Sequence, residues 1–81
     1  MKTDQVSETV YWKYFNGSYK IYAENPDVIK FLNSQKDSRR HSVYTFNQKI
    51  RGYDYIISAD KLKFFIRQIK SEIGEKATLV L

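Results

Sequence analysis

The sequence predicts a two-layer α+β fold of order ββαββα, in which a four-stranded antiparallel sheet carries two helices on one face. Two observations support this prediction. Asn16-Gly17 separates two segments rich in β-branched and aromatic residues, and Asn-Gly is the strongest short signal for a β-hairpin. Residues 62–73 place apolar side chains at helical spacing, which indicates an amphipathic helix packed against a sheet.

The first half of the chain is predicted to form a hairpin, with strands over residues 9–15 and 18–24, followed by a helix. Asn25-Pro26-Asp27 marks the start of the helix, because it combines a capping side chain, a proline at the first helical position and an acid in the first turn. The helix is expected to end near Asn33-Ser34. Residues 35–42 are then interpreted as a polar, basic loop.

The second half is predicted to repeat this order, with strands over residues 43–50 and 53–57 joined around Arg51-Gly52. Ser58 is expected to cap the second helix, and Gly74 is expected to end it.

The chain of 81 residues is long enough for one domain, which we assign to residues 9–76. Residues 1–8 are polar and without periodicity, so this segment is expected to be flexible. Residues 77–81 are apolar and are interpreted as a tail or a short fifth strand. The residues expected to be buried together are Trp12, Ile21, Phe46, Leu62, Phe65, Ile66 and Ile69.

The Asn-Gly turn also predicts the register of the first hairpin, with Phe15 opposite Ser18 and Lys13 opposite Lys20. This register assigns one face to the core: Val10, Trp12, Tyr14, Tyr19, Ile21 and Ala23. In the second hairpin, the residues assigned to the core are Tyr44, Phe46, Ile50, Tyr55 and Ile57. The opposite face of the sheet has no helix to cover it and is left to solvent or to a partner.

The formal net charge of +5 favours an anionic partner. The chain has no cysteine and one histidine, which excludes disulfides and the usual zinc sites, so no metal is expected. No apolar run approaches the roughly 18 residues of a membrane span, and the first ten residues lack the apolar core of a signal peptide. We therefore expect a cytoplasmic protein without a membrane partner.

The sheet face without helices is expected to combine lysines with aromatic rings, as in several proteins that bind single-stranded nucleic acid. Lysine and arginine would neutralise phosphates, and tyrosine would stack on bases. The expected interface consists of Tyr11, Lys13, Phe15, Lys20, Tyr22, Arg39, Arg40 and Lys49. A second candidate surface is the outer side of the second helix, with Lys63, Phe64, Arg67 and Lys70.

Enzyme chemistry needs polar groups that converge, and the sequence does not predict such a group. Asp27 and Asp60 are explained as helix-start residues, and His41 lies in a predicted loop. We expect a non-enzymatic domain without a cofactor. Two functions stay open: binding of nucleic acid, or docking on an acidic protein as an adaptor or inhibitor of the kind carried by phages and mobile elements. A homodimer is also expected, through the tail or an edge strand, because so short a chain buries a limited core.

Overall fold

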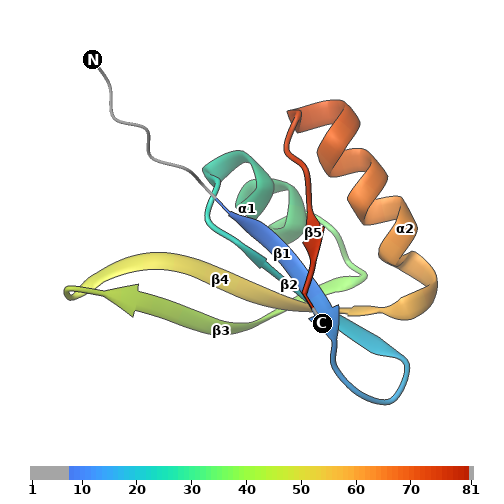
Figure 1. Cartoon of the computed structure of the whole chain (residues 1–81), viewed down its shortest axis with the longest axis horizontal. Helices are drawn as coiled ribbons and strands as arrows, with labels where there is room; N and C mark the ends of the chain where they lie inside the picture. The colour runs from blue at the N-terminus through green and yellow to red at the C-terminus, as the bar shows by residue number, and fades with distance from the viewer. Residues whose placement is uncertain (1–7, 81) are drawn as a thin grey trace.

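The computed structural model describes residues 8–80 and has two helices packed on one face of a sheet (Figure 1). The predicted flexible segment lies outside the described residues, apart from Glu8. The elements are β1 (Thr9–Lys13), β2 (Ser18–Ala23), α1 (Pro26–Asn33), β3 (Ser38–Phe46), β4 (Lys49–Ser58), α2 (Ala59–Gln68), η1 (Ile69–Ile73) and β5 (Thr78–Leu79). The element η1 is a π-helical continuation of α2. The predicted α+β class is confirmed.

The sheet has five strands in the order β3-β4-β2-β1-β5, so the prediction of four antiparallel strands is incomplete. The added strand is β5, which runs parallel to β1 with Tyr11 opposite Leu79. The backbone N–H of Val80 donates to the carbonyl of Tyr11 at 2.8 Å. The tail therefore covers the outer edge of β1, which would otherwise expose unpaired backbone groups.

The helices begin and end where capping chemistry predicts. The Asn25 side chain accepts a hydrogen bond from the Asp27 N–H at 2.8 Å, and Gly74 ends η1 with a left-handed φ of 85°. Ser58 precedes α2, but its hydroxyl donates to the Asp60 carboxylate at 2.7 Å instead of accepting from the backbone. Asn25 and Ser58 are thus both residue types that favour an N-cap, but their side chains form different hydrogen bonds.

The core lies between the helices and the central strands β2 and β4. Its buried members are Ile21, Ala23, Val28, Leu32, Tyr55, Ile57, Phe65 and Ile69. The predicted stripe of α2 is confirmed at Phe65 and Ile69, and Leu62 packs against the core half-buried. Ile66 and Trp12 are only half-buried, so the expectation that both are buried is wrong.

The first hairpin has the predicted turn but not the predicted register. Asn16 and Gly17 have φ values of 53° and 71°, and Ser18 N–H donates to the Phe15 carbonyl at 3.1 Å. However, the Tyr14 N–H donates to the Ser18 carbonyl at 2.9 Å, so Tyr14 and Phe15 both lie against Ser18. This extra residue is a β-bulge, and it shifts the pairing of β1 by one position.

The shifted register places Trp12 opposite Lys20 and Tyr11 opposite Ile21. Because side chains alternate between faces, a shift of one residue moves every β1 side chain to the other face of the sheet. Tyr11 therefore packs toward the helices, and Trp12 lies on the face without helices. The predicted faces of β1 are wrong for this reason.

The second hairpin turns four residues earlier than predicted. The turn is at Asn47-Gln48, with φ values of 53° and 65°, and Arg51-Gly52 lies inside β4. At the other end, β3 begins at Ser38, so residues 38–42 are strand and not the predicted loop. A tight hairpin turn of type I′ needs positive φ at both central residues, and Asn47 and Gln48 adopt it, so the chain does not turn at Arg51-Gly52.

Gly52 is required by a close approach of another strand. A Cβ atom at this position would lie 2.7 Å from the Ala23 carbonyl oxygen and 2.8 Å from two atoms of the Tyr22 ring. We expect Gly52→Ala to lower the free energy of unfolding by about 1–3 kcal/mol, because the strands must separate to admit the methyl group. Urea denaturation measures this loss. Thr45→Ala, at an exposed position on β3, is the control and should change stability by less than about 0.5 kcal/mol. Equal stability of the two variants would contradict the close contact of Gly52 with Ala23 and Tyr22.

The β3–β4 hairpin extends beyond the rest of the sheet and forms an arm, defined here as residues 43–52 (Figure 1). The pairing of β4 with β2 ends at Tyr53, so residues 49–52 pair only with β3. Phe46 and Ile50 are 61% and 60% exposed, and Tyr44 is also exposed. The prediction that these three belong to the core is wrong, because the helices do not reach the arm. The same prediction is confirmed for Tyr55 and Ile57.

Candidate nucleic-acid interface

The sheet face without helices contains a buried carboxylate, Asp54 on β4. Ser42 N–H donates to Asp54 Oδ1 at 3.0 Å, and the Tyr44 hydroxyl donates to Oδ2 at 2.8 Å. Lys20 Nζ lies 3.4 Å from Oδ2 and is itself nearly buried. A buried charge is tolerated only when it is paired and hydrogen-bonded, and Asp54 meets both conditions.

An irregularity in β3 explains why Asp54 is needed. The pairing of β3 with β4 shifts between Arg40 and Ser42, which makes His41 an inserted residue. Asp54 accepts the Ser42 N–H that lies just beyond this insertion. His41 Nδ1 is 3.7 Å from Asp54 Oδ1, and the Tyr14 ring lies 4.4 Å from Lys20 Nζ. Lys20 is thus enclosed by its partners, and the expectation that it lies exposed on the sheet face is wrong.

A second polar group joins β2 to the arm. The Tyr22 hydroxyl donates to Glu24 Oε2 at 2.7 Å, and Arg51 Nε donates to the same oxygen at 2.8 Å. Burial, together with the hydrogen bond to Glu24, raises the pKa of Tyr22 to about 12. Burial would raise the pKa of Glu24, but the hydrogen bonds from Tyr22, Arg51 and the Glu8 N–H lower it overall. The Glu24 carboxylate thus stays charged and holds the Arg51 guanidinium in place.

The structure separates the residues of the predicted sheet-face interface. Tyr11 and Lys13 lie on the helix side, opposite Ile21 and Tyr19 respectively, and Lys20 and Tyr22 lie on the other side. Phe15 is exposed, but it belongs to the bulge and turn of the first hairpin. The predicted surface of lysines and rings on one face is therefore wrong for the first hairpin.

The structure brings the other predicted cations onto a single hairpin. Arg39, Arg40 and Lys49 are all exposed on β3 and β4. Arg39 pairs with Ile56 and so lies on the face without helices, whereas Arg40 pairs with Tyr55 on the helix side. Among residues 8–80, no strand pairs with the outer edge of β3, so these cations flank an open strand edge.

Sequence reasoning missed two members of this surface, Phe46 and Arg51. The Arg51 guanidinium lies 5.7 Å from the centroid of the Phe46 ring, at the outer part of the arm. Similarly, the Arg40 guanidinium lies 4.7 Å from the Tyr53 ring centroid. A signal was present in the sequence: residues 38–53 contain four Lys or Arg and no Asp or Glu.

The second predicted surface lies elsewhere on the molecule. Its members, Lys63, Phe64, Arg67 and Lys70, are exposed on α2 and η1. Figure 1 shows α2 and the tip of the β3–β4 hairpin at opposite ends of the molecule. The tip of the hairpin is therefore separate from the α2 surface, whereas the base of β3 lies near α2, where Lys61 Nζ is 3.9 Å from Asp37 Oδ2.

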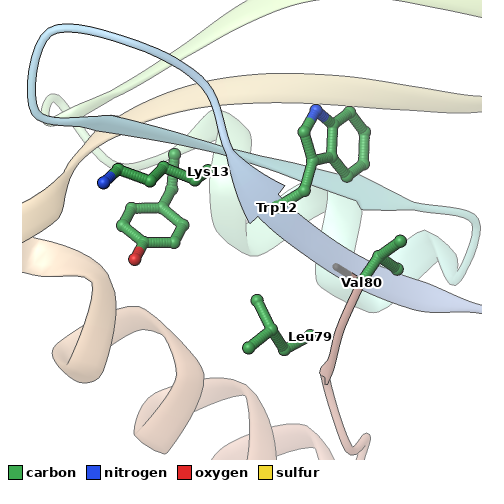
Figure 2. A pocket seen from close by; sticks show the side chains of 5 residues that line it. Trp12, Lys13, Leu79 and Val80 are labelled. Atoms are coloured by element: carbon green, nitrogen blue, oxygen red, sulfur yellow. The ribbon is translucent and has the colours of Figure 1, made fainter.

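A cavity of about 530 Å³ lies at the edge of the sheet formed by β1 and β5, far from the arm in the strand order (Figure 2). Its lining consists of Trp12, Lys13, Tyr19, Leu79 and Val80. This lining of aromatic and aliphatic side chains with one ammonium group suits a small apolar group. It lacks the converging polar atoms that catalysis requires.

Within residues 8–80, no cluster of three or more His, Cys, Asp or Glu side chains is arranged to hold a metal ion. Over the same residues, none of the helices has the length and apolar character needed to cross a membrane. The fold and this surface together define a small α+β domain with a basic β-hairpin arm. Comparisons with protein-family models, curated proteins and solved structures give no match to this chain.

Proposed function

We propose that this domain binds nucleic acid through the β3–β4 hairpin, without catalysis and without a cofactor. The observation that carries the proposal is the charge of residues 38–53, which include four Lys or Arg and no Asp or Glu. These cations lie along an open edge and an exposed arm, where phosphates can reach them. Contacts with phosphates supply most of the affinity of proteins that bind nucleic acid without sequence preference.

The length of the hairpin is sufficient for contact with several phosphates of one strand. Arg39 lies seven positions before Phe46, and Phe46 pairs with Lys49 at the tip. At roughly 3.3 Å per residue, this distance is about 23 Å along the strand. One strand of duplex DNA presents a phosphate about every 3.4 Å along the axis, so the hairpin spans roughly seven phosphates.

We expect Arg39→Gln, Arg40→Gln and Lys49→Gln each to reduce the salt dependence of binding. Each substitution removes one phosphate contact, so the slope of log K against log salt should fall by about one unit. Fluorescence anisotropy over a series of salt concentrations measures the slope. Lys63→Gln and Arg67→Gln, on the exposed side of α2, are matched controls that should leave it unchanged. If the α2 variants lower the slope and the hairpin variants do not, the interface is on the helix.

A second candidate function is docking on an acidic partner protein. It is favoured by the exposed apolar side chains of the arm, Val43, Phe46 and Ile50, because exposed apolar groups often mark protein contacts. The open edge of β3 also offers backbone groups for strand addition, either to a partner or to a second copy of this chain. The homodimer stays a proposal, which sedimentation over a range of concentrations tests.

A further inference from the structure

Phe46 lies at the outer end of the β3–β4 hairpin. It pairs with Lys49 on the last rung of the hairpin, immediately before the turn at Asn47-Gln48. The positive φ values of these two residues give the hairpin a tight end. With 61% of its surface exposed, the Phe46 side chain contacts little of its own protein. It has cations for neighbours, Lys49 across the hairpin and Arg51 at 5.7 Å from the ring centroid.

The other rings near the arm are unsuited to stacking on a single strand. Tyr22 and Tyr44 meet edge to face, with ring centroids 5.0 Å apart and an interplanar angle of 74°. Their hydroxyls are held by Glu24 and Asp54. A single-strand binder needs several exposed ring faces on which successive bases stack. One isolated exposed ring at a tip favours insertion at one point instead.

Duplex DNA is the nucleic acid that accepts such an insertion. Proteins that enter its minor groove place apolar wedges, phenylalanine among them, between base pairs and bend the helix by about 20–90°. In duplex RNA the major groove is too deep and narrow for side chains to read, and recognition relies mostly on shape and backbone contacts. Lys49, across the hairpin from Phe46, is exposed and can contact a phosphate beside an opened step.

We infer that the arm enters the groove of duplex DNA and that Phe46 inserts between base pairs and kinks the helix. This inference rests on the proposed function, because the charges of the hairpin must first bring the arm to the DNA. Arg51 acts as a positioning residue, since Glu24 holds its guanidinium at 2.8 Å while it lies over the Phe46 ring. Pyrimidine–purine steps such as TA are the easiest to unstack and are the expected sites of insertion.

The test measures binding and bending on the same DNA. A duplex of about 25 base pairs with a central TA step carries a fluorophore pair at its ends, and anisotropy and energy transfer are recorded together. We expect energy transfer to rise as the wild-type protein saturates the duplex. Phe46→Ala should bind with the same salt slope but lose most of this rise, whereas Phe46→Leu should keep it, since leucine is also a wedge.

The matched control is Phe15→Ala, which removes an equally exposed phenylalanine (57%) from the turn of the other hairpin and should bend DNA like the wild type. Wild-type binding without bending, or equal bending by Phe46→Ala, overturns the inference and leaves the proposed function standing. Binding confined to single strands or to RNA likewise overturns the inference and leaves the proposed function standing. A wild-type protein that binds no nucleic acid but binds polyglutamate overturns both and favours the acidic protein partner.

Discussion

Replacing Asp54 with alanine is expected to lower the free energy of unfolding by about 3–5 kcal/mol, because one substitution leaves the nearly buried Lys20 charge without a partner and removes two hydrogen-bond acceptors. The nearly buried Lys20 ammonium loses the carboxylate that lies 3.4 Å away. The Ser42 N–H and the Tyr44 hydroxyl lose their acceptors as well. The backbone beside the inserted residue His41 then lacks its hydrogen-bond acceptor, so the pairing of β3 with β4 should loosen first.

A double-mutant cycle separates the ion pair from the hydrogen bonds. Asp54→Asn keeps a side chain of the same shape and an acceptor oxygen, but it leaves the Lys20 charge unpaired. Adding Lys20→Met removes that charge, so the double variant should recover part of the stability lost by Asp54→Asn. Asp37→Ala is the control, because Asp37 is a half-exposed carboxylate 3.9 Å from Lys61 and should contribute at most about 1 kcal/mol. Urea denaturation of the set would falsify the account if Asp54→Ala lost no more stability than Asp37→Ala.

The parts of the fold that the sequence predicts well are those with local causes. A cap such as Asn25 acts on the N–H two residues away, and Gly74 ends a helix through its own φ. The apolar spacing around Phe65 and Ile69 needs only the helical period. Each of these signals is complete within a few residues, so both helices were predictable.

The register of the first hairpin depends on a single bulge that the sequence does not mark. Residues 10–15 carry aromatic or apolar side chains on both faces, with Tyr11 beside Trp12 and Tyr14 beside Phe15. Because the alternation of apolar and polar residues normally selects the buried face, this segment gives no preference. The hydrogen bond from Tyr14 to Ser18 decides the register, and that bond forms only in the folded sheet.

In the second hairpin, two turn signals compete and the weaker one is used. Gly52 is more typical of a turn than Gln48, but its lack of a side chain is needed where the Tyr22 ring crosses β4. Asp54 was missed as a structural centre because an acid in a strand usually indicates a surface position. Its partners come from β2 and β3, so no local pattern contains them.

The candidate site was predictable in its charge but not in its geometry. The absence of acids between residues 38 and 53 is a property of the sequence, and it points to Arg39, Arg40 and Lys49. Lys20 carries the same charge and was expected at the same surface, yet its burial beside Asp54 removes it. Whether a cation contacts a partner or a carboxylate of its own chain depends on strand pairing, which the sequence did not determine here.

Phe65→Ala is expected to lower the free energy of unfolding by about 3–5 kcal/mol, as is usual when a buried phenylalanine is truncated. Phe65 is 1% exposed and joins α2 to the sheet core formed by Ile21 and Ile57. It also meets Phe31 of α1 edge to face, with ring centroids 5.8 Å apart, so its loss weakens the contact between the two helices as well as the contact between the layers. Each kcal/mol lowers Tm by about 4–8 °C in a domain of this size, so the melting curve should move strongly.

The neighbouring Phe64 is the matched control for this loss. Phe64 is 45% exposed, and its ring centroid is 5.6 Å from that of Phe65, so Phe64→Ala removes a similar side chain from the same helix without opening the core. We expect it to cost less than about 1 kcal/mol, since much of its surface already contacts water. If Phe64→Ala proved the more damaging of the two, the face of α2 that packs on the sheet would be the one carrying Lys63, Arg67 and Lys70. The charged stripe would then be in the interior, where unpaired cations are strongly unfavourable. The burial of Phe65 and Ile69 together predicts the opposite order.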